Sequence, residues 1–162
     1  MRRRCAPQGD LATSAAGKWK AEAIRYTPAT EHLSFIDSCR VAHLATADGD
    51  GSPHVVPVCF AYLDGAFWVA IDEKPKTTRR LKRIRNIETN PRVSLVFDRY
   101  DEDWFRLAYV LVRGTASVVE RAPLEVVAAL RARYTQYESM KLEERPAIQI
   151  TPESVVAWGD LG

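Results

Sequence analysis

The chain has 162 residues, of which 46% are hydrophobic and 27% are charged, and its net charge is +2. This length fits one domain with a core of its own, and a charge so near balance argues against a dedicated nucleic-acid-binding protein. No apolar run approaches the ~20 residues that a membrane-spanning helix needs, and the basic start of the chain lacks the apolar stretch of a signal peptide. We expect a cytoplasmic protein whose partner is a small-molecule substrate.

Residues 1–28 show no sustained hydrophobic period, so we expect them to form a mobile arm, with the domain itself over 29–162. The domain begins with a short helix, and Thr30 is expected to be its N-cap. A later helix, from Pro123 to about residue 137, carries apolar side chains on one face at helical spacing.

The rest of the sequence has the alternation and the turn residues of antiparallel strands. Asp-Gly pairs at 48–51 and 64–65 predict two hairpins, and Gly114 predicts a bend or bulge in a long strand. The expected strands lie over 41–46, 54–62, 66–71, 92–98, 107–120, 147–150 and 155–158. A chain of about six antiparallel strands and few helices favours a mainly β fold, a closed or partly closed barrel with flanking helices.

A basic segment follows the strand at 66–71. Its cations are Lys74, Lys76, Arg79, Arg80, Lys82, Arg83 and Arg85. A solvated helix normally alternates acids with bases, because like charges four residues apart repel, and here only Asp72 and Glu73 precede the cations. Thr77 and Thr78 lie near the expected start of a helix, where the helix dipole favours an anion. The segment predicts a phosphate site, with a solvated surface helix as the alternative.

The sequence contains no recognisable catalytic constellation, and the catalytic residues stay unassigned. His32, His43 and His54 are scattered, and none has the spacing of a metal pair. The three cysteines form no CxxC pair, so we expect reduced thiols and no metal site. An oxidoreductase with a bound redox cofactor fits this composition, because the cofactor carries the difficult chemistry and the protein supplies position and electrostatics.

Four runs of the chain resemble the pyridoxamine 5′-phosphate oxidase-like (PPOX class) split-barrel superfamily. They are GSPHVVPVCF, DEKPKTTRRLKRIRNIETNPRVSLVFDRYDEDW, LRARYTQY and the terminal AW. The motifs DEKPK and DRYDEDW are specific, whereas NPRV is shared more widely. Within the superfamily the chain looks most like the branch of coenzyme F-420-dependent oxidoreductases. The resemblance implies a six-stranded antiparallel split barrel of the FMN-binding type.

The resemblance also implies a function and an assembly. Two subunits are expected to form a homodimer with the cofactor in a groove at their interface. The expected reaction moves a hydride between reduced coenzyme F-420, a deazaflavin, and a small unsaturated or oxidised organic substrate. The alternatives are FMN or haem as the cofactor, or a carrier protein without turnover. The run HVVPVCF lacks the Arg and Lys that flank this strand in the phosphate oxidases, which argues against pyridoxamine phosphate oxidation.

Carried over residue by residue, the resemblance implies a set of cofactor contacts. The phosphate ligands are expected to be Lys76, Thr77, Lys82 and Arg83, with Asn86 one helical turn after Arg83. The ring system is expected to rest on Val56, Pro57, Val58, Ala70, Ile71 and Asp72. Trp104 and Trp158 are expected to close the groove, from the same or the partner subunit, with ordinary packing as the alternative.

Overall fold

The computed structural model describes residues 27–71 and 81–162. Almost all of the expected arm lies outside these ranges, as do Asp72, Lys76 and Thr77, so the statements about them remain predictions. Within the described ranges, each helix is too short or too polar to cross a membrane.

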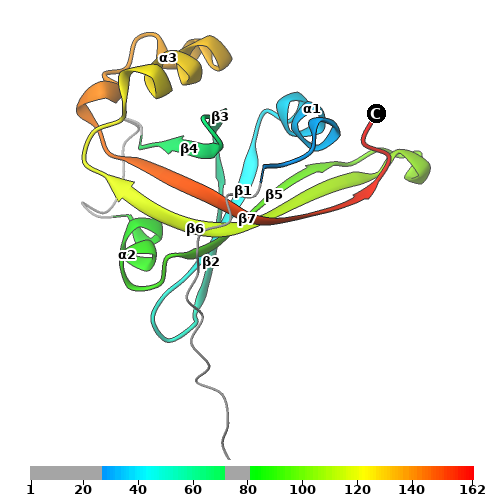
Figure 1. The fold of residues 1–162 in the computed structure, drawn as a ribbon, viewed down its shortest axis with the longest axis horizontal. Coiled ribbons are helices and arrows are strands. Elements are labelled where there is room, and N and C mark those ends of the chain that lie inside the picture. The colour runs from blue at the N-terminus through cyan, green and yellow to red at the C-terminus, as the bar shows by residue number, and fades with distance from the viewer. Residues whose placement is uncertain (1–26, 72–80) are drawn as a thin grey trace, which may run out of the picture.

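A single seven-stranded sheet, in the order β2-β1-β5-β6-β7-β4-β3, forms the framework (Figure 1). Every strand pair in it is antiparallel, and the sheet curls along its two long strands, β6 and β7. The strands are β1 (Ala42–Ala47), β2 (Pro53–Val58), β3 (Ala61–Leu63), β4 (Ala66–Ala70), β5 (Arg92–Arg99), β6 (Ala108–Val119) and β7 (Ala147–Gly159). The prediction of a mainly β, partly closed barrel is confirmed.

Two strand predictions were wrong in their bounds. The expected strand over 54–62 is divided into β2 and β3, which do not pair with each other but lie at opposite edges of the sheet. The two short strands expected at the end of the chain form one strand, β7, whose pairing with β6 shifts register between Arg113 and Gly114. A Cβ at Gly114 would lie 2.1 Å from the carbonyl oxygen of Thr151, so the bulge expected at this glycine is confirmed, and the close strand contact requires it.

Three α-helices and three short 3₁₀ helices accompany the sheet. They are α1 (Thr30–Ser38), α2 (Lys82–Thr89), α3 (Leu124–Arg133), η1 (Trp104–Arg106), η2 (Thr135–Tyr137) and η3 (Leu142–Glu144). Thr30 is the first helical residue rather than the N-cap, which is Ala29. The basic helix α2 begins at Lys82 after an extended Leu81, so its N-terminus is not at Thr77 as the sequence led us to expect.

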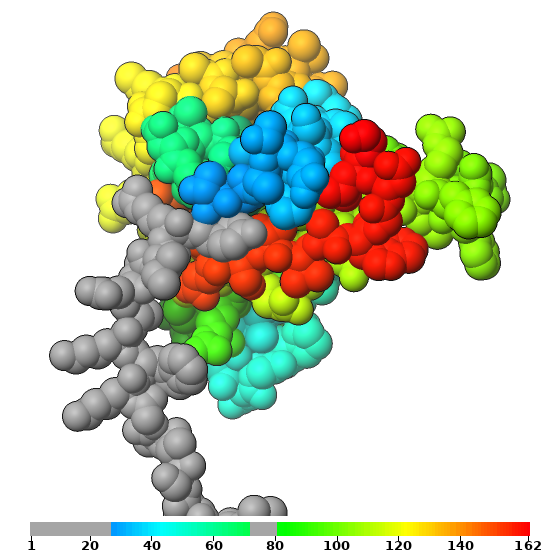
Figure 2. All heavy atoms as spheres, turned by 45° about the vertical axis from the view of Figure 1, so that its right-hand side comes forward, coloured from blue at the N-terminus to red at the C-terminus, as the bar shows by residue number. Residues whose placement is uncertain are grey.

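Two apolar clusters hold these elements together. The larger lies on the inner face of the curled sheet, where Phe35 of α1 and Ile87 of α2 pack against strand residues such as Phe97. The smaller lies under α3, where Leu130 covers Trp68 of β4. The segment carrying η1 projects from the side of the molecule (Figure 2).

The outer face of the sheet is open over β1, β2 and β5. Side chains on this face of β1, β2 and β5 alternate with the buried ones, and they are exposed or half-buried. His43 and Val55 are examples. Helix α3 covers the same face of the sheet at β4, where Trp68 and Ala70 belong to the smaller cluster.

Candidate functional site

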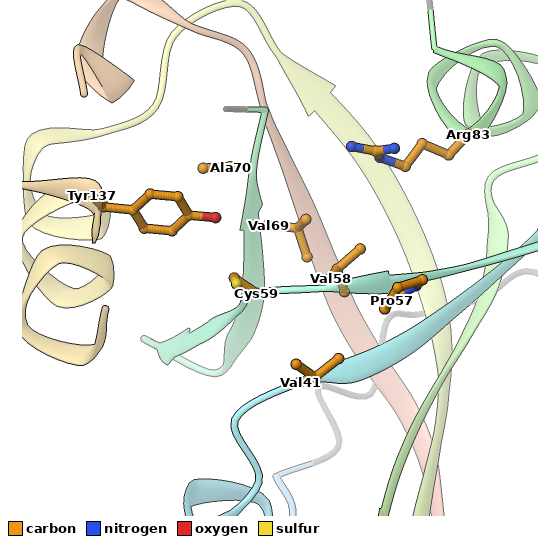
Figure 3. Close-up of a pocket in the computed structure, with 8 residues that line it drawn as sticks. All are labelled: Val41, Pro57, Val58, Cys59, Val69, Ala70, Arg83 and Tyr137. Carbon is orange, nitrogen blue, oxygen red and sulfur yellow. The ribbon is translucent and has the colours of Figure 1, made fainter. Parts of the chain in front are cut away.

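A pocket of about 220 Å³ lies near the point where the chain passes from β2 to β3 (Figure 3). Because β2 and β3 are the two edges of the sheet, this pocket marks the open seam of the half-barrel. Its lining residues are Val41, Pro57, Val58, Cys59, Val69, Ala70, Arg83 and Tyr137. Four of the expected cofactor residues, Pro57, Val58, Ala70 and Arg83, therefore meet in one place from β2, β4 and α2.

The pocket has an apolar floor with a polar group on each side. Arg83 reaches in from α2 and the Tyr137 ring reaches in from η2, on opposite sides of the aliphatic residues of β2 and β4 (Figure 3). Tyr137 is buried and packs edge-on against Tyr134, with 5.6 Å between ring centroids. An apolar surface with a few convergent polar groups is the usual composition of a small-molecule site.

A tyrosine clamp holds the seam beside the pocket. The amide of Phe60, in the β2–β3 connection, donates to the hydroxyl of Tyr134 at 3.0 Å. The same hydroxyl lies 3.1 Å from the carbonyl oxygens of Phe60 and Arg40, and its proton can serve one of them. Because this hydroxyl bonds the backbone of both Phe60 and Arg40, it connects the end of α3 to the wall of the pocket.

Asn86 connects helix α2 to the sheet rather than pointing into the pocket. Its side chain is only 2% exposed, and its Nδ2 donates to Oγ1 of Thr46 at 3.0 Å. That hydroxyl in turn donates to the carbonyl oxygen of His54 at 3.3 Å. This chain of bonds joins α2 to β1 and β2. Arg83 lies three residues before Asn86, on the same side of the helix, so the bond fixes where Arg83 enters the pocket.

His54 lies within the electrostatic reach of the same helix. Burial, followed by the positive charges of Lys82 and Arg83, lowers the pKa of His54 from its usual value of 6.5. A cation next to an imidazole disfavours the protonated ring. The cations at the start of α2 therefore favour the neutral form of the His54 ring on β2.

The other expected cofactor residues lie apart from the pocket. Val56 packs against the inner cluster and Ile71 belongs to it. Lys82, the first residue of α2, is half-buried but does not line the pocket. Trp104 on η1 is 73% exposed, and Trp158 stacks on Tyr109 with 6.0 Å between ring centroids. Neither tryptophan lines the pocket of its own chain.

Sequence reasoning missed several residues that line the pocket. Tyr137 belongs to LRARYTQY, a run that carried the family resemblance but to which we assigned no role. Cys59 was expected to be a buried thiol, and it is half-buried in the pocket wall, whereas Cys39 is buried. Among the residues described, no three His, Cys, Asp or Glu side chains gather into a group that could hold a metal.

Replacing Asn86 tests its place between α2 and the sheet. Asn86→Leu removes the donor and leaves the buried Thr46 hydroxyl with one bond fewer, so we expect the free energy of unfolding to fall by about 1–3 kcal/mol. Urea denaturation measures this loss. Arg85→Ala, at an exposed position of the same helix, should change it by less than about 0.5 kcal/mol. An Asn86→Leu protein as stable as the wild type would contradict this role.

The lowered pKa of His54 predicts a pH effect. Because the folded state resists protonation of this ring, the unfolded state binds more protons, and stability falls as the pH falls through 6.5. NMR titration of the imidazole should give a pKa below 6.5 that rises in Arg83→Ala and stays unchanged in Arg85→Ala. A pKa of His54 that is the same in Arg83→Ala as in the wild type would show that this cation does not act on His54.

Comparison with known proteins agrees with this geometry. A family model described as pyridoxamine 5′-phosphate oxidase matches residues 29–159. The search of curated proteins gave no match.

Among solved structures, the haem storage protein HutZ from Vibrio cholerae has a TM-score of 0.63 at 22% identity, covering 83% of this chain and 95% of that one. A conserved hypothetical protein from Mycobacterium tuberculosis has a TM-score of 0.65 at 23% identity, covering 84% of this chain and 88% of that one. A haem-binding protein from Mycobacterium smegmatis has a TM-score of 0.57 at 20% identity, covering 85% of this chain and 57% of that one.

At these identities the structural neighbours establish the fold alone, which is the antiparallel FMN-binding split barrel that the sequence led us to expect. The family assignment rests on the sequence model, because its match extends from the start of α1 to the end of β7. The chain therefore belongs to the pyridoxamine 5′-phosphate oxidase family of split-barrel proteins.

Proposed function

We propose that the pocket at the seam holds part of the ring system of a phosphate-bearing flavin-type cofactor, and that the protein is an oxidoreductase. The observation that carries this proposal is the meeting of Arg83 with the apolar residues Pro57, Val58 and Ala70 in one pocket. Aliphatic side chains suit the flat face of a ring, and a guanidinium suits a phosphate or carboxylate, to which it can donate two parallel hydrogen bonds.

Coenzyme F-420 is the cofactor we propose first, with FMN as the alternative. The resemblance of DEKPK and DRYDEDW to the F-420-dependent branch favours the deazaflavin, and the basic segment supplies cations for its phosphate and polyglutamate tail. The missing Arg and Lys of the HVVPVCF strand leave FMN with fewer ligands. When bound, the reduced cofactor supplies a hydride to a small unsaturated or oxidised substrate. Solvent or an unassigned side chain supplies the proton that completes the two-electron reduction.

The pocket of one chain is too small for the whole cofactor. Its volume of about 220 Å³ lies below the roughly 300–1,000 Å³ of complete small-molecule sites. We therefore propose that a second copy of the chain completes the site, as a homodimer. Apolar side chains on β6 and β7 support this assembly. On the open face, the exposed Tyr109 lies opposite the exposed Trp158, and the half-buried Leu111 lies opposite the exposed Val156.

Haem binding is the second candidate function. Two of the structural neighbours are named as haem storage or haem-binding proteins. In this chain, His54 supplies a neutral imidazole, which is the form that ligates haem iron, and the adjacent Lys82 and Arg83 suit the carboxylates of the haem propionates. The same basic end of α2 thus serves either cofactor class.

Equilibrium titration of the purified chain with F-420, FMN and haemin separates these candidates. We expect F-420 to bind, and Arg83→Ala to weaken that binding by about 1–3 kcal/mol because one charged hydrogen-bond donor is lost. Arg85→Ala is the matched control and should bind as the wild type does. Failure of both F-420 and FMN to bind would refute the flavin proposal. A haemin Soret band that His54→Ala abolishes would establish the haem alternative.

Thiol alkylation shows where the ligand sits. In a Cys5→Ser background only Cys59 in the pocket wall and the buried Cys39 remain. Bound cofactor should slow the modification of Cys59 and leave Cys39 unchanged. A ligand that binds without protecting Cys59 would place the site elsewhere.

The homodimer has its own test. Val156→Arg puts a charge on the open face and should weaken self-association at least tenfold, about 1.4 kcal/mol, in sedimentation equilibrium. Leu124→Arg is the control, because Leu124 is also apolar and is more exposed than Val156, at 73% against 42%, but lies on α3. A wild-type monomer at tens of micromolar, or equal dissociation in both variants, would rule out this interface.

A further inference from the structure

A second hollow of about 370 Å³ lies on the outer face of the sheet, apart from the pocket at the seam. Its floor and walls include Ala45 and Ala47 of β1, Ser94 of β5, and the charged residues Arg92, Arg113 and Glu153. It shares no lining residue with the pocket that contains Arg83.

Small side chains create this hollow. Strand alternation puts Ala45 and Ala47 on the outer face of β1, and the register places Ser94 between Ala45 on one side and Arg113 on the other. Because alanine and serine side chains are small, they leave a space that larger side chains at the same positions would fill. The outer face of β1, β5 and β6 therefore contains a hollow that is bordered by long basic side chains.

Arg92 and Arg113 lie close together on this face. Ser94 pairs with Arg113 and Arg92 pairs with Thr115, so the two arginines are diagonal cross-strand neighbours, and side chains at such positions are within reach of each other. Both are exposed. Within residues 27–71 and 81–162, neither guanidinium forms a hydrogen bond or an ion pair, whereas Arg99, Arg131 and Arg133 each donate to backbone carbonyls.

We propose that this hollow is a second anion-binding site, for the phosphate or carboxylate group of a small organic ligand. Two adjacent guanidinium groups repel each other unless an anion lies between them, and together they offer a planar array of donors that matches an oxyanion. The carboxylate of Glu153, which also lines the hollow, repels an anion such as inorganic phosphate. It can accept a hydrogen bond from an ammonium or hydroxyl group of a ligand. The preferred ligand therefore carries an ammonium or hydroxyl group next to its anionic group.

The site is independent of the cofactor proposal. It uses β1, β5, β6 and β7 rather than α2. Arg113 lies four residues along β6 from Tyr109 on the same outer face of the sheet, so the hollow borders the surface proposed for dimerisation. Loss of cofactor binding in Arg83→Ala would leave this hollow intact. Loss of anion binding in Arg113→Ala would leave the pocket at the seam intact.

NMR titration of the full chain with inorganic phosphate, succinate and phosphoethanolamine tests the proposal. Saturable shifts of the Ala45 and Ser94 amides are expected with phosphate or succinate, and the better of the two identifies the anionic group. Phosphoethanolamine should bind more tightly than inorganic phosphate. Arg113→Ala should weaken binding at least tenfold and Arg113→Lys should restore only part of it. Arg121→Ala, an exposed arginine elsewhere, should have no effect.

Glu153→Gln provides the sharpest readout. It should strengthen binding of inorganic phosphate and weaken that of phosphoethanolamine, because the carboxylate repels the first and pairs with the ammonium of the second. A circular dichroism melt of each variant confirms that it is folded, as expected for exposed positions. Shifts that do not saturate with any probe, or equal losses in Arg113→Ala and Arg121→Ala, would overturn the proposal.

Discussion

The position of helix α2 depends on one buried hydrogen bond, between the amide of Asn86 and the hydroxyl of Thr46. A buried polar group without a partner is costly, so this pair tolerates little sliding of the helix along β1. Ile87 packs into the inner cluster beside it and adds apolar burial. The first turn of α2 is strongly basic. Because water screens like charges, the repulsion among these cations would be weaker if the helix moved into solvent. The bond from Asn86 to Thr46 and the apolar contacts of Ile87 thus help to hold Arg83 at the seam.

The topology explains why the seam is the place for a ligand. A closed barrel has no edges, but here β2 and β3 remain unpaired with each other and the chain crosses directly between them. Side chains from β2, β4, α2 and η2 therefore converge on the pocket beside the β2–β3 connection. The inner cluster behind them is packed with aromatic residues, including Phe60, Phe67 and Phe97. That rigid backing favours a preformed pocket over one that the ligand must open.

Much of the fold followed from local sequence patterns, because hairpin turns and alternation act over a few residues. The Asp-Gly turns and the bulge at Gly114 are examples. The division between β2 and β3 escaped prediction, since it depends on the strands choosing opposite sheet edges. The site was predicted in part: Pro57, Val58, Ala70 and Arg83 share the pocket. Tyr137 and the structural use of Asn86 were missed, because both depend on contacts between segments far apart in sequence.

The hydroxyl of Tyr134 has a consequence for how the protein responds to an occupant. It bonds the backbone of Phe60, while its neighbour Tyr137 forms the facing wall of the pocket. Any widening of the seam must therefore either break that bond or carry α3 along with the strand connection. Helix α3 covers β3 and β4 through its own apolar cluster. If α3 moves with the strand connection, the smaller cluster between α3 and these strands must therefore shift as well. A change in the width of the pocket is thus coupled to a movement of α3. A spectroscopic probe attached to that helix would therefore detect a ligand in the pocket without touching it.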